Sequence, residues 1–271
     1  MSTTLSPLAE KVILVTGAAS GLGKAMAMGL AAAGADLAIA AKPESARPLA
    51  LVREAILAQH PDRRVTCLVI DIVREADCEA GIAASLQEHG RLDALINNAG
   101  VGMDSVGPNI SQRLTFLDVS VDKWRSIVDT NVNGTFLMTR AVAPYFVRRG
   151  RGRIINLSTS FSTMVRQGFA PYGPSKAAVE TMTAILAKDL EGTGVTVNAL
   201  LPGGPADTNM ILASDAPDRT KLIAPSIMVP PAIWLVSDAA SGFTGKRVIA
   251  KDWNPTVPAN ELAAACANAA W

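Results

Sequence analysis

The sequence is poor in the residues that build metal centres and disulfide frameworks. Its 271 residues include three cysteines and two histidines, scattered along the chain as Cys67, Cys78, Cys266, His60 and His89. No CxxC pair and no Cys/His cluster occurs, which argues against a zinc site or a disulfide framework. We therefore predict no bound metal, and a protein of the reducing cytoplasm.

Long apolar runs and an imbalance of charge are also missing. No stretch of about 18 apolar residues could span a membrane, and the N-terminal segment lacks the basic and apolar regions of a secretory signal. The formal net charge is +1, so no overall field attracts nucleic acid or an anionic membrane. No GxSxG or HExxH motif occurs, which argues against a serine hydrolase or a zinc protease. A soluble globular protein is the remaining class.

What is present is an alternation of short apolar runs with longer helical patterns. The predicted strands are 11–17, 35–41, 64–72, 92–100, 152–158, 195–204 and 246–252. The predicted helices are 21–34, 46–61, 76–90, 122–150 and 171–194, with a short helix and turn at 230–245. This alternation predicts an α/β fold built of βαβ units, with a parallel sheet covered by helices on both faces.

No linker, repeat or low-complexity stretch divides the chain. We therefore predict one dinucleotide-binding and catalytic domain over residues 1–271, with an N-terminal arm at 1–10 and a C-terminal tail at 253–271. Within the tail, "ANELAAACANAAW" favours a terminal helix that packs on the domain or contacts another subunit. The long polar stretch 101–121 is predicted to loop over a site, because binding residues are common on loops.

Three glycines stand between the first predicted strand and the first predicted helix, in "TGAASGLGKA". Gly17, Gly21 and Gly23 would let the backbone approach a pyrophosphate, which the free N–H groups and dipole of the helix N-terminus favour. The motif is not a P-loop, because no Ser or Thr follows the lysine. A tight strand-to-helix turn would also require glycine, but the place after the first strand favours nucleotide binding.

The residues after the second and third strands indicate which dinucleotide binds. Such sites often carry a carboxylate after the second strand for the ribose 2′-hydroxyl, but Lys42 stands here instead. An ammonium pairs with a 2′-phosphate that a carboxylate would repel. We therefore prefer NADP(H) to NAD(H), which remains possible. Asp71 could accept a hydrogen bond from an adenine amino group. Both side chains could instead be solvated loop residues.

The stretch "LSTSFSTMVRQGFAPYGPSK" ends in a tyrosine and a lysine four residues apart, so Tyr172 and Lys176 lie on one helix face. A free phenol, with a pKa of about 10, is a poor base at neutral pH. A nearby ammonium lowers that pKa, and the tyrosine could then exchange a proton with an alcohol or a ketone. YxxxK also arises by chance, so this interpretation depends on the neighbouring motifs.

Together the motifs resemble the classical short-chain dehydrogenase/reductase family, over nearly the whole chain. The resemblance rests on five motifs in order, "TGAASGLG" (16–23), "NNAG" (97–100), Asn131 in "NVNG", "YGPSK" (172–176) and "PGG" (202–204). It implies a Rossmann-like doubly wound parallel sheet of about seven strands in three α/β/α layers. It also implies a nicotinamide cofactor and a homotetramer or homodimer.

The resemblance further implies roles for single residues. Tyr172 would be the general acid/base, Lys176 would also bind the nicotinamide ribose, and Asn131 would belong to a water relay that supplies the proton. The cofactor would lie along Gly17, Ser20, Gly21, Leu22, Gly23, Lys42, Asp71, Ile72, Asn98, Ala99, Gly100, Tyr172, Lys176, Pro202, Gly203 and Thr208.

The family places a serine three residues after the Asn of the fifth strand and thirteen before the tyrosine. Counting from Asn156 or back from Tyr172 leads to Thr159, whose hydroxyl would stabilise charge on the substrate oxygen. Ser160 is the alternative if the loop is shifted by one residue. Ser158 should point away, because strand residues alternate. Substrate contacts are expected from Thr159, Ser160, Phe161, Met164 and Tyr172.

These residues predict an oxidoreductase of CH–OH groups, an alcohol dehydrogenase or carbonyl reductase. The apolar residues after the fifth strand favour a small to medium, mainly hydrophobic alcohol or ketone as the substrate. Two other functions stay open, a non-catalytic dinucleotide-binding sensor or scaffold and a family-type dehydratase or epimerase. The first would not need Asn131, Tyr172 and Lys176 together, and the second usually has a larger C-terminal extension.

Overall fold

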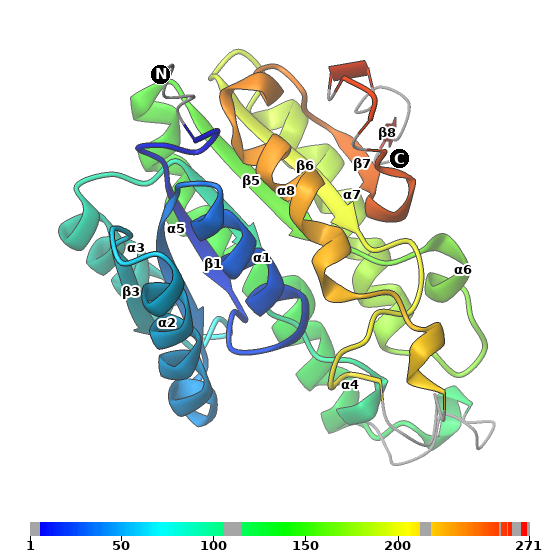
Figure 1. The fold of residues 1–271 in the computed structure, drawn as a ribbon. Helices are drawn as coiled ribbons and strands as arrows, with labels where there is room; N and C mark the ends of the chain where they lie inside the picture. Colours follow the sequence, from blue (N-terminus) through cyan, green and yellow to red (C-terminus); the bar gives the residue numbers. More distant parts are fainter. Residues whose placement is uncertain are drawn as a thin grey trace.

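The computed structural model describes residues 6–105, 115–211, 218–254, 256–258, 260–261 and 267–269 (Figure 1). Its strands are β1 (Val12–Thr16), β2 (Asp36–Ala41), β3 (Val65–Val69), β4 (Ala94–Asn97), β5 (Gly152–Leu157), β6 (Val195–Leu201), β7 (Lys246–Ile249) and β8 (Ala267–Ala269). Its helices are α1 (Gly21–Ala32), α2 (Ala46–Gln59), α3 (Glu75–His89), α4 (Val121–Val128), α5 (Gly134–Arg149), α6 (Phe161–Met164), α7 (Tyr172–Asp189) and α8 (Val229–Val236).

Seven parallel strands in the order β3-β2-β1-β4-β5-β6-β7 form the sheet, which confirms the predicted fold class. Successive residues of a strand face opposite sides of a sheet. Ile13 and Val15 accordingly pack toward α1, α2 and α8, whereas Val12 and Leu14 pack toward α3, α5 and α7. Both faces are therefore apolar, which explains the unbroken apolar runs in the strands.

Two elements differ from the sequence-based expectations. The predicted helix 122–150 contains a π-helical turn, Asp129–Asn133, between α4 and α5. The predicted terminal helix is wrong for residues 267–269, which form β8 antiparallel to β7. A sheet edge offers unpaired backbone groups to any segment that reaches it, and helix propensity alone does not reveal that. The predicted loop 101–121 contains short 3₁₀ turns, and its residues 106–114 lie outside the described residues.

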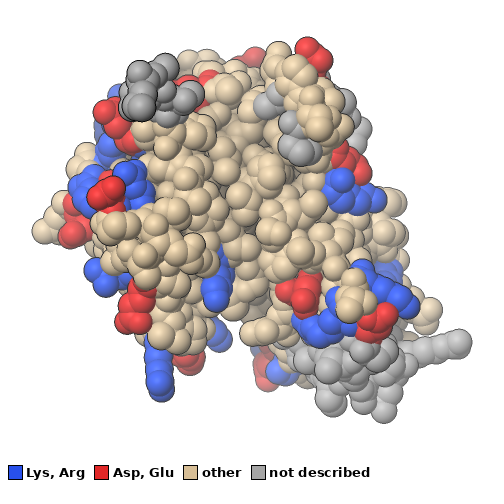
Figure 2. Space-filling view, in the orientation of Figure 1, with Lys and Arg blue, Asp and Glu red and all other residues tan. Residues whose placement is uncertain are grey.

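The carboxyl ends of β1, β5 and β6 point toward the side of the molecule where α4 and α6 lie (Figure 1). In the same orientation, Figure 2 shows charged side chains mostly at the periphery, with almost none over α1 and α8. Across the part of the chain that the structure describes, no helix is both long and apolar enough to cross a membrane.

Candidate functional site

The crevice between β1 and β4 is the topological switch point of the sheet, where the chain connections leave in opposite directions. Asn98 fixes the two strand ends together. Its Nδ2 donates to the carbonyl oxygens of Thr16 and Gly17 at 2.9 and 3.1 Å. The Thr16 hydroxyl in turn accepts from the backbone N–H groups of Asn98 and Ala99, both at 3.0 Å. Asn98 and Ala99, which are both predicted to contact the cofactor, thus join the ends of β1 and β4 at the bottom of the crevice.

The glycine turn has no room for side chains. Gly17 has φ +64°, and a Cβ there would stand 2.8 Å from the Cα of Ala99. A Cβ on Gly23 would collide with the carbonyl oxygen of Gly17. A Cβ on Gly21 would stand 3.1 Å from Cγ2 of Thr208. The structure therefore brings Thr208 to the glycine turn from the far half of the chain.

The N-terminus of α1 is open toward this turn. The Ser20 side chain does not cap the helix, and the first turn carries no acidic residue. Leu22 packs against the apolar core beneath. The first N–H groups of a helix have no partner within it, and they favour an anion. A backbone cradle that a Cβ would fill, beside an uncapped helix N-terminus, fits the pyrophosphate of a dinucleotide.

Lys42 and Asp71 stand at one edge of the sheet, because β2 and β3 pair side by side up to Ala41 and Val69. The Lys42 side chain is 62% exposed, and its Nζ lies 3.8 Å from a carboxylate oxygen of Glu44. Asp71 is half-buried. The Ile72 side chain, by contrast, is buried in the core and contacts the start of α5.

Tyr172 and Lys176 lie in the first two turns of α7. The Lys176 Nζ is 5.9 Å from the centroid of the Tyr172 ring and donates to the carbonyl oxygen of Leu157 at 2.9 Å. Burial lowers the pKa of Lys176 to about 8, because desolvation penalises the charged form. A Cβ on Gly100 would stand 3.6 Å from this Nζ, which places the end of "NNAG" beside the ammonium group.

Asn131 lies in the π-helical turn, buried next to α7. Its side-chain oxygen accepts from the N–H of Val101 at 2.8 Å, and its Nδ2 donates to the carbonyl oxygen of Val101 at 3.0 Å. The same Nδ2 donates to Ser175 Oγ at 3.0 Å, and Ser175 donates to the carbonyl oxygen of Tyr172 at 2.7 Å. Asn131 thus connects the loop after β4 with the helix that carries Tyr172 and Lys176. Turns of this type are frequent at functional sites.

The three neighbouring hydroxyl residues at the end of β5 have different surroundings. Ser158 is buried and donates to a carboxylate oxygen of Glu180 at 2.5 Å. Ser160 hydrogen-bonds two other hydroxyl groups within α6. The Thr159 side chain is half-buried, and its carbonyl oxygen accepts from Arg247 at 3.0 Å. The hydroxyls of Ser158 and Ser160 thus already have protein partners.

The remaining predicted substrate residues lie on α6, which packs against the start of α7. Phe161 is 65% exposed, whereas Met164 is buried. A Cβ on Gly173 would collide with the backbone oxygen of Met164, so the glycine allows α6 to approach Tyr172. The short α6 thus presents one apolar side chain, that of Phe161, to solvent.

The loop after β6 is fastened at both ends. The carbonyl oxygen of Pro202 accepts from the N–H of Lys251 at 3.1 Å. Gly203 has φ +92°, and a side chain there would meet the side chain of Lys251. Farther along, Arg219 donates to the carbonyl oxygen of Thr208 at 3.0 Å. These contacts hold Thr208 beside the glycine turn.

Sequence reasoning missed three charged residues that hold this site together, Glu180, Arg219 and Arg247. Glu180 follows Tyr172 by eight residues and Lys176 by four, so helical spacing places it on the same face. Arg247 follows Lys246 at the start of the predicted strand 246–252, where two adjacent basic residues would normally be assigned to solvent. For Arg219 we find no signal in the sequence.

A model of the short chain dehydrogenase family matches residues 11–218 of this chain. A 3-oxoacyl-[acyl-carrier-protein] reductase of Synechocystis sp. is 33% identical over 199 residues, which cover 73% of this chain and 76% of that protein. A chloroplastic NADPH-dependent aldehyde reductase-like protein of Arabidopsis thaliana is 35% identical over 226 residues, 80% of each chain. The crystal structure of a short chain dehydrogenase of Shigella flexneri complexed with NADP has a TM-score of 0.80 at 28% identity, covering 92% of this chain and 100% of that chain.

Proposed function

Because the chain belongs to the short-chain dehydrogenase/reductase family, we propose that it is a nicotinamide-dependent oxidoreductase that interconverts an alcohol and a ketone. The cofactor of the proposal is NADP(H), and the substrate is small to medium and mainly hydrophobic. The observation that carries the proposal is the buried Lys176 beside Tyr172, joined through Asn131 and Ser175 to the crevice edge.

The proposed mechanism assigns the proton to Tyr172. In reduction its phenol gives a proton to the ketone oxygen, and in oxidation the phenolate takes the proton of the alcohol. Lys176, whose pKa of about 8 leaves it mostly charged at neutral pH, favours the phenolate. Thr159 donates a hydrogen bond to the same substrate oxygen, and Asn131 belongs to the relay that returns the proton. The bound nicotinamide supplies or accepts the hydride.

The exposed apolar side chain of Phe161, on the short helix α6 that packs against α7, favours apolar substrates. A panel of aldehydes, ketones and alcohols, followed by the absorbance of NADPH, tests the proposal directly. We expect turnover of apolar ketones in preference to polyanionic ones. Saturable NADPH binding without turnover of any compound would contradict the proposal and support a binding protein that acts as a sensor or scaffold.

Lys42 carries the proposed preference for NADP(H), since its exposed ammonium at the end of β2 is free to turn from Glu44 toward a 2′-phosphate. Exposed ion pairs are weak, so Glu44 does not hold it. Lys42→Glu should raise the Kd for NADPH about tenfold to a hundredfold and leave NADH binding unchanged or tighter. Quenching of tryptophan fluorescence measures both.

The matched control is Lys188→Glu. It makes the same change of charge in the last turn of α7, away from the end of β2. It should leave both dissociation constants unchanged. If Lys42→Glu binds NADPH as tightly as the unmodified protein, Lys42 does not read the 2′-phosphate.

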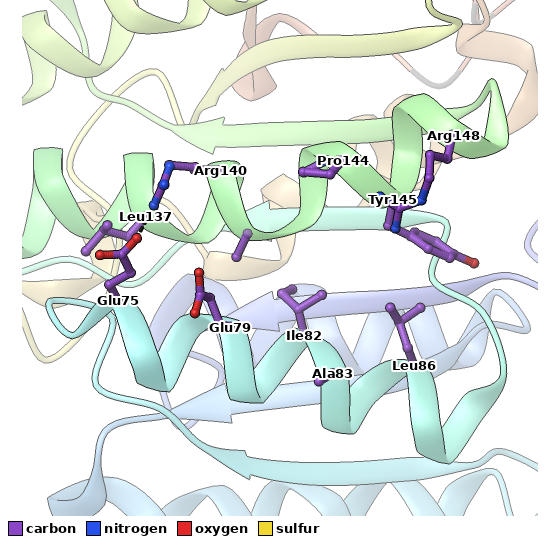
Figure 3. A pocket seen from close by; sticks show the side chains of 11 residues that line it. Glu75, Glu79, Ile82, Ala83, Leu86, Leu137, Arg140, Pro144, Tyr145 and Arg148 are labelled. Atoms are coloured by element: carbon purple, nitrogen blue, oxygen red, sulfur yellow. Dashed lines mark hydrogen bonds and ion pairs between the residues drawn. The ribbon is translucent and has the colours of Figure 1, made fainter.

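Two grooves flank α5, and they differ in chemistry. The groove between α3 and α5 has a volume of about 350 Å³, and Figure 3 shows Glu75 and Glu79 on one side of it and Arg140 and Arg148 on the other. Glu75 pairs with Arg140 across it. The groove between α5 and α7, of about 400 Å³, is lined mainly by apolar side chains and includes the 45% exposed Phe136. Apolar surface of this kind favours burial against a partner.

We propose that the α5–α7 groove joins two copies of the chain into a homodimer, or into a homotetramer of two such dimers. A twofold interface buries the same patch on both copies, so a charge introduced into the groove is buried once on each copy. Phe136→Asp should lower the molar mass measured by light scattering after size-exclusion chromatography. Leu51→Asp, on the exposed face of α2, is the control and should not. An unchanged mass for Phe136→Asp would exclude this groove as the interface.

The proposal also includes a cytoplasmic location. Cys67 and Cys78 are free thiols, and Cys78 is buried with its pKa raised to about 12, mainly by desolvation. Unpaired thiols persist in a reducing compartment, and a thiol with such a pKa is not reactive at neutral pH.

A further inference from the structure

The inward face of α7 carries a charged or phenolic group on three successive turns. Tyr172, Lys176 and Glu180 follow each other at intervals of four residues, so they lie above one another on one side of the helix. Each of the two charged side chains reaches the end of β5. Lys176 bonds the carbonyl oxygen of Leu157, and Glu180 accepts from the hydroxyl of Ser158.

Glu180 is paired with an arginine from a third element. The Nε of Arg247, in the middle of β7, lies 2.8 and 3.1 Å from the two carboxylate oxygens of Glu180. Both side chains are largely buried, with exposures of 6% for Glu180 and 13% for Arg247. Arg247 points toward α7 because its neighbour Val248 packs on the opposite face of the sheet.

The same guanidinium reaches the residue that we propose as the substrate's hydrogen-bond donor. Its other end donates to the carbonyl oxygen of Thr159 at 3.0 Å. Ser158 and Thr159 are the first two residues after β5, and the N–H of Ser158 makes one more hydrogen bond to β6, to the carbonyl oxygen of Leu200 at 2.9 Å. The pair thus holds the Ser158 side chain and the Thr159 backbone carbonyl at the point where the chain leaves the sheet.

We propose that Glu180 and Arg247 are positioning residues, which set the turn Ser158–Thr159 so that the Thr159 hydroxyl meets the substrate oxygen next to Tyr172. The inference rests on the proposed function, because only an enzyme with these roles needs that alignment. Small displacements of reacting groups cost much in rate. Because Glu180 lies on α7, the Glu180–Arg247 pair also fixes the position of the turn relative to the helix that carries Tyr172.

A purely structural role accounts poorly for this arrangement. Burying two charges carries a desolvation cost that their attraction often does not exceed, and apolar pairs of similar volume are often as stable. An apolar pair could not make two of the contacts seen here, the hydrogen bonds to the Ser158 hydroxyl and to the Thr159 carbonyl oxygen. Removing both charges together therefore separates positioning from folding.

The central test compares the unmodified protein with the double variant Glu180→Leu/Arg247→Met, using NADPH and the best substrate of the panel. The double variant leaves no buried charge unpaired, so it should melt near the unmodified protein. We expect kcat to fall on the order of 10- to 100-fold, with the Kd for NADPH within about twofold, since neither side chain contacts the glycine turn. The single variant Arg247→Lys should also have a low kcat, because an ammonium lacks the planar fork with which the guanidinium reaches two acceptors.

A second readout needs neither substrate nor cofactor. Amide hydrogen exchange in a peptide covering residues 157–164 should be faster in the double variant, whereas peptides from α1 should exchange as before. Lys11→Met is the matched control. It removes another long-range ion pair, of 2.6 Å to Asp238, at the opposite end of the sheet, and it should change neither kcat nor exchange at 157–164.

The outcomes separate this inference from the proposed function. If the unmodified protein turns over substrate and the folded double variant keeps its kcat, the positioning role is wrong. If the unmodified protein binds NADPH but reduces nothing, the proposed function fails, and the exchange data alone decide. Faster exchange at 157–164 would then support the pair as the element that sets the turn, and unchanged exchange would overturn it.

Discussion

Tyr172→Phe is expected to lower kcat by roughly 10²- to 10⁴-fold, the usual contribution of a positioned acid or base. The change removes one oxygen and keeps the ring, which packs edge-on against Phe169 with centroids 6.4 Å apart. Fold and cofactor site should therefore survive, and the Kd for NADPH should change by less than about threefold. Steady-state kinetics with NADPH and a fluorescence titration measure the two quantities.

Tyr145→Phe is the control for this experiment. Tyr145 is the other tyrosine of the chain, and its hydroxyl accepts a 3.4 Å hydrogen bond from the N–H of Leu92, in the groove between α3 and α5. Its loss should leave kcat unchanged. A Tyr172→Phe enzyme with normal turnover would mean that another group moves the proton, and the mechanism above would be wrong.

Gly17→Ala is expected to abolish tight cofactor binding. Two costs add at this position. The left-handed backbone disfavours a side chain by about 1–2 kcal/mol, and the new Cβ would stand 2.8 Å from the Cα of Ala99 and 2.9 Å from Nδ2 of Asn98. The clash separates the ends of β1 and β4, which form the floor of the crevice. We expect about 2–4 kcal/mol less stability and a Kd for NADPH raised more than about tenfold.

Gly150→Ala isolates the part of this effect that comes from backbone conformation, so the steric part at Gly17 follows by difference. Gly150, after α5, has φ +68°, nearly the same as Gly17, but a Cβ there would have no atom within 4 Å. It should lose only about 1–2 kcal/mol of stability and bind NADPH normally. Chemical denaturation and fluorescence titration of both variants provide the comparison. Equal effects at the two positions would show that backbone conformation alone, and not the crevice contact, explains the glycine.

The sequence alone determined the class of fold and the position of the glycine turn after β1. Apolar runs that alternate with helical patterns leave few alternatives to a parallel sheet covered on both faces. Glycines at a strand-to-helix turn and YxxxK on one helix face are local patterns, because their geometry depends on residues at most a few positions apart. The order of the strands and the switch point between β1 and β4 came from the structure, yet they agree with the family that the motifs indicated.

Only the tertiary structure decided which side chains meet across the sheet. Glu180 and Arg247 are separated by 67 residues in the sequence. Arg219 donates a hydrogen bond to Thr208, and no motif in the intervening sequence predicts that contact. The π-helical turn at Asn131 and the edge strand β8 likewise depend on partners elsewhere in the chain. Such contacts are fixed when helices pack on strands, and propensity and spacing describe only neighbours along the chain. The chemistry that we propose for this site was therefore suggested by local motifs, while the alignment of its residues was set by long-range packing.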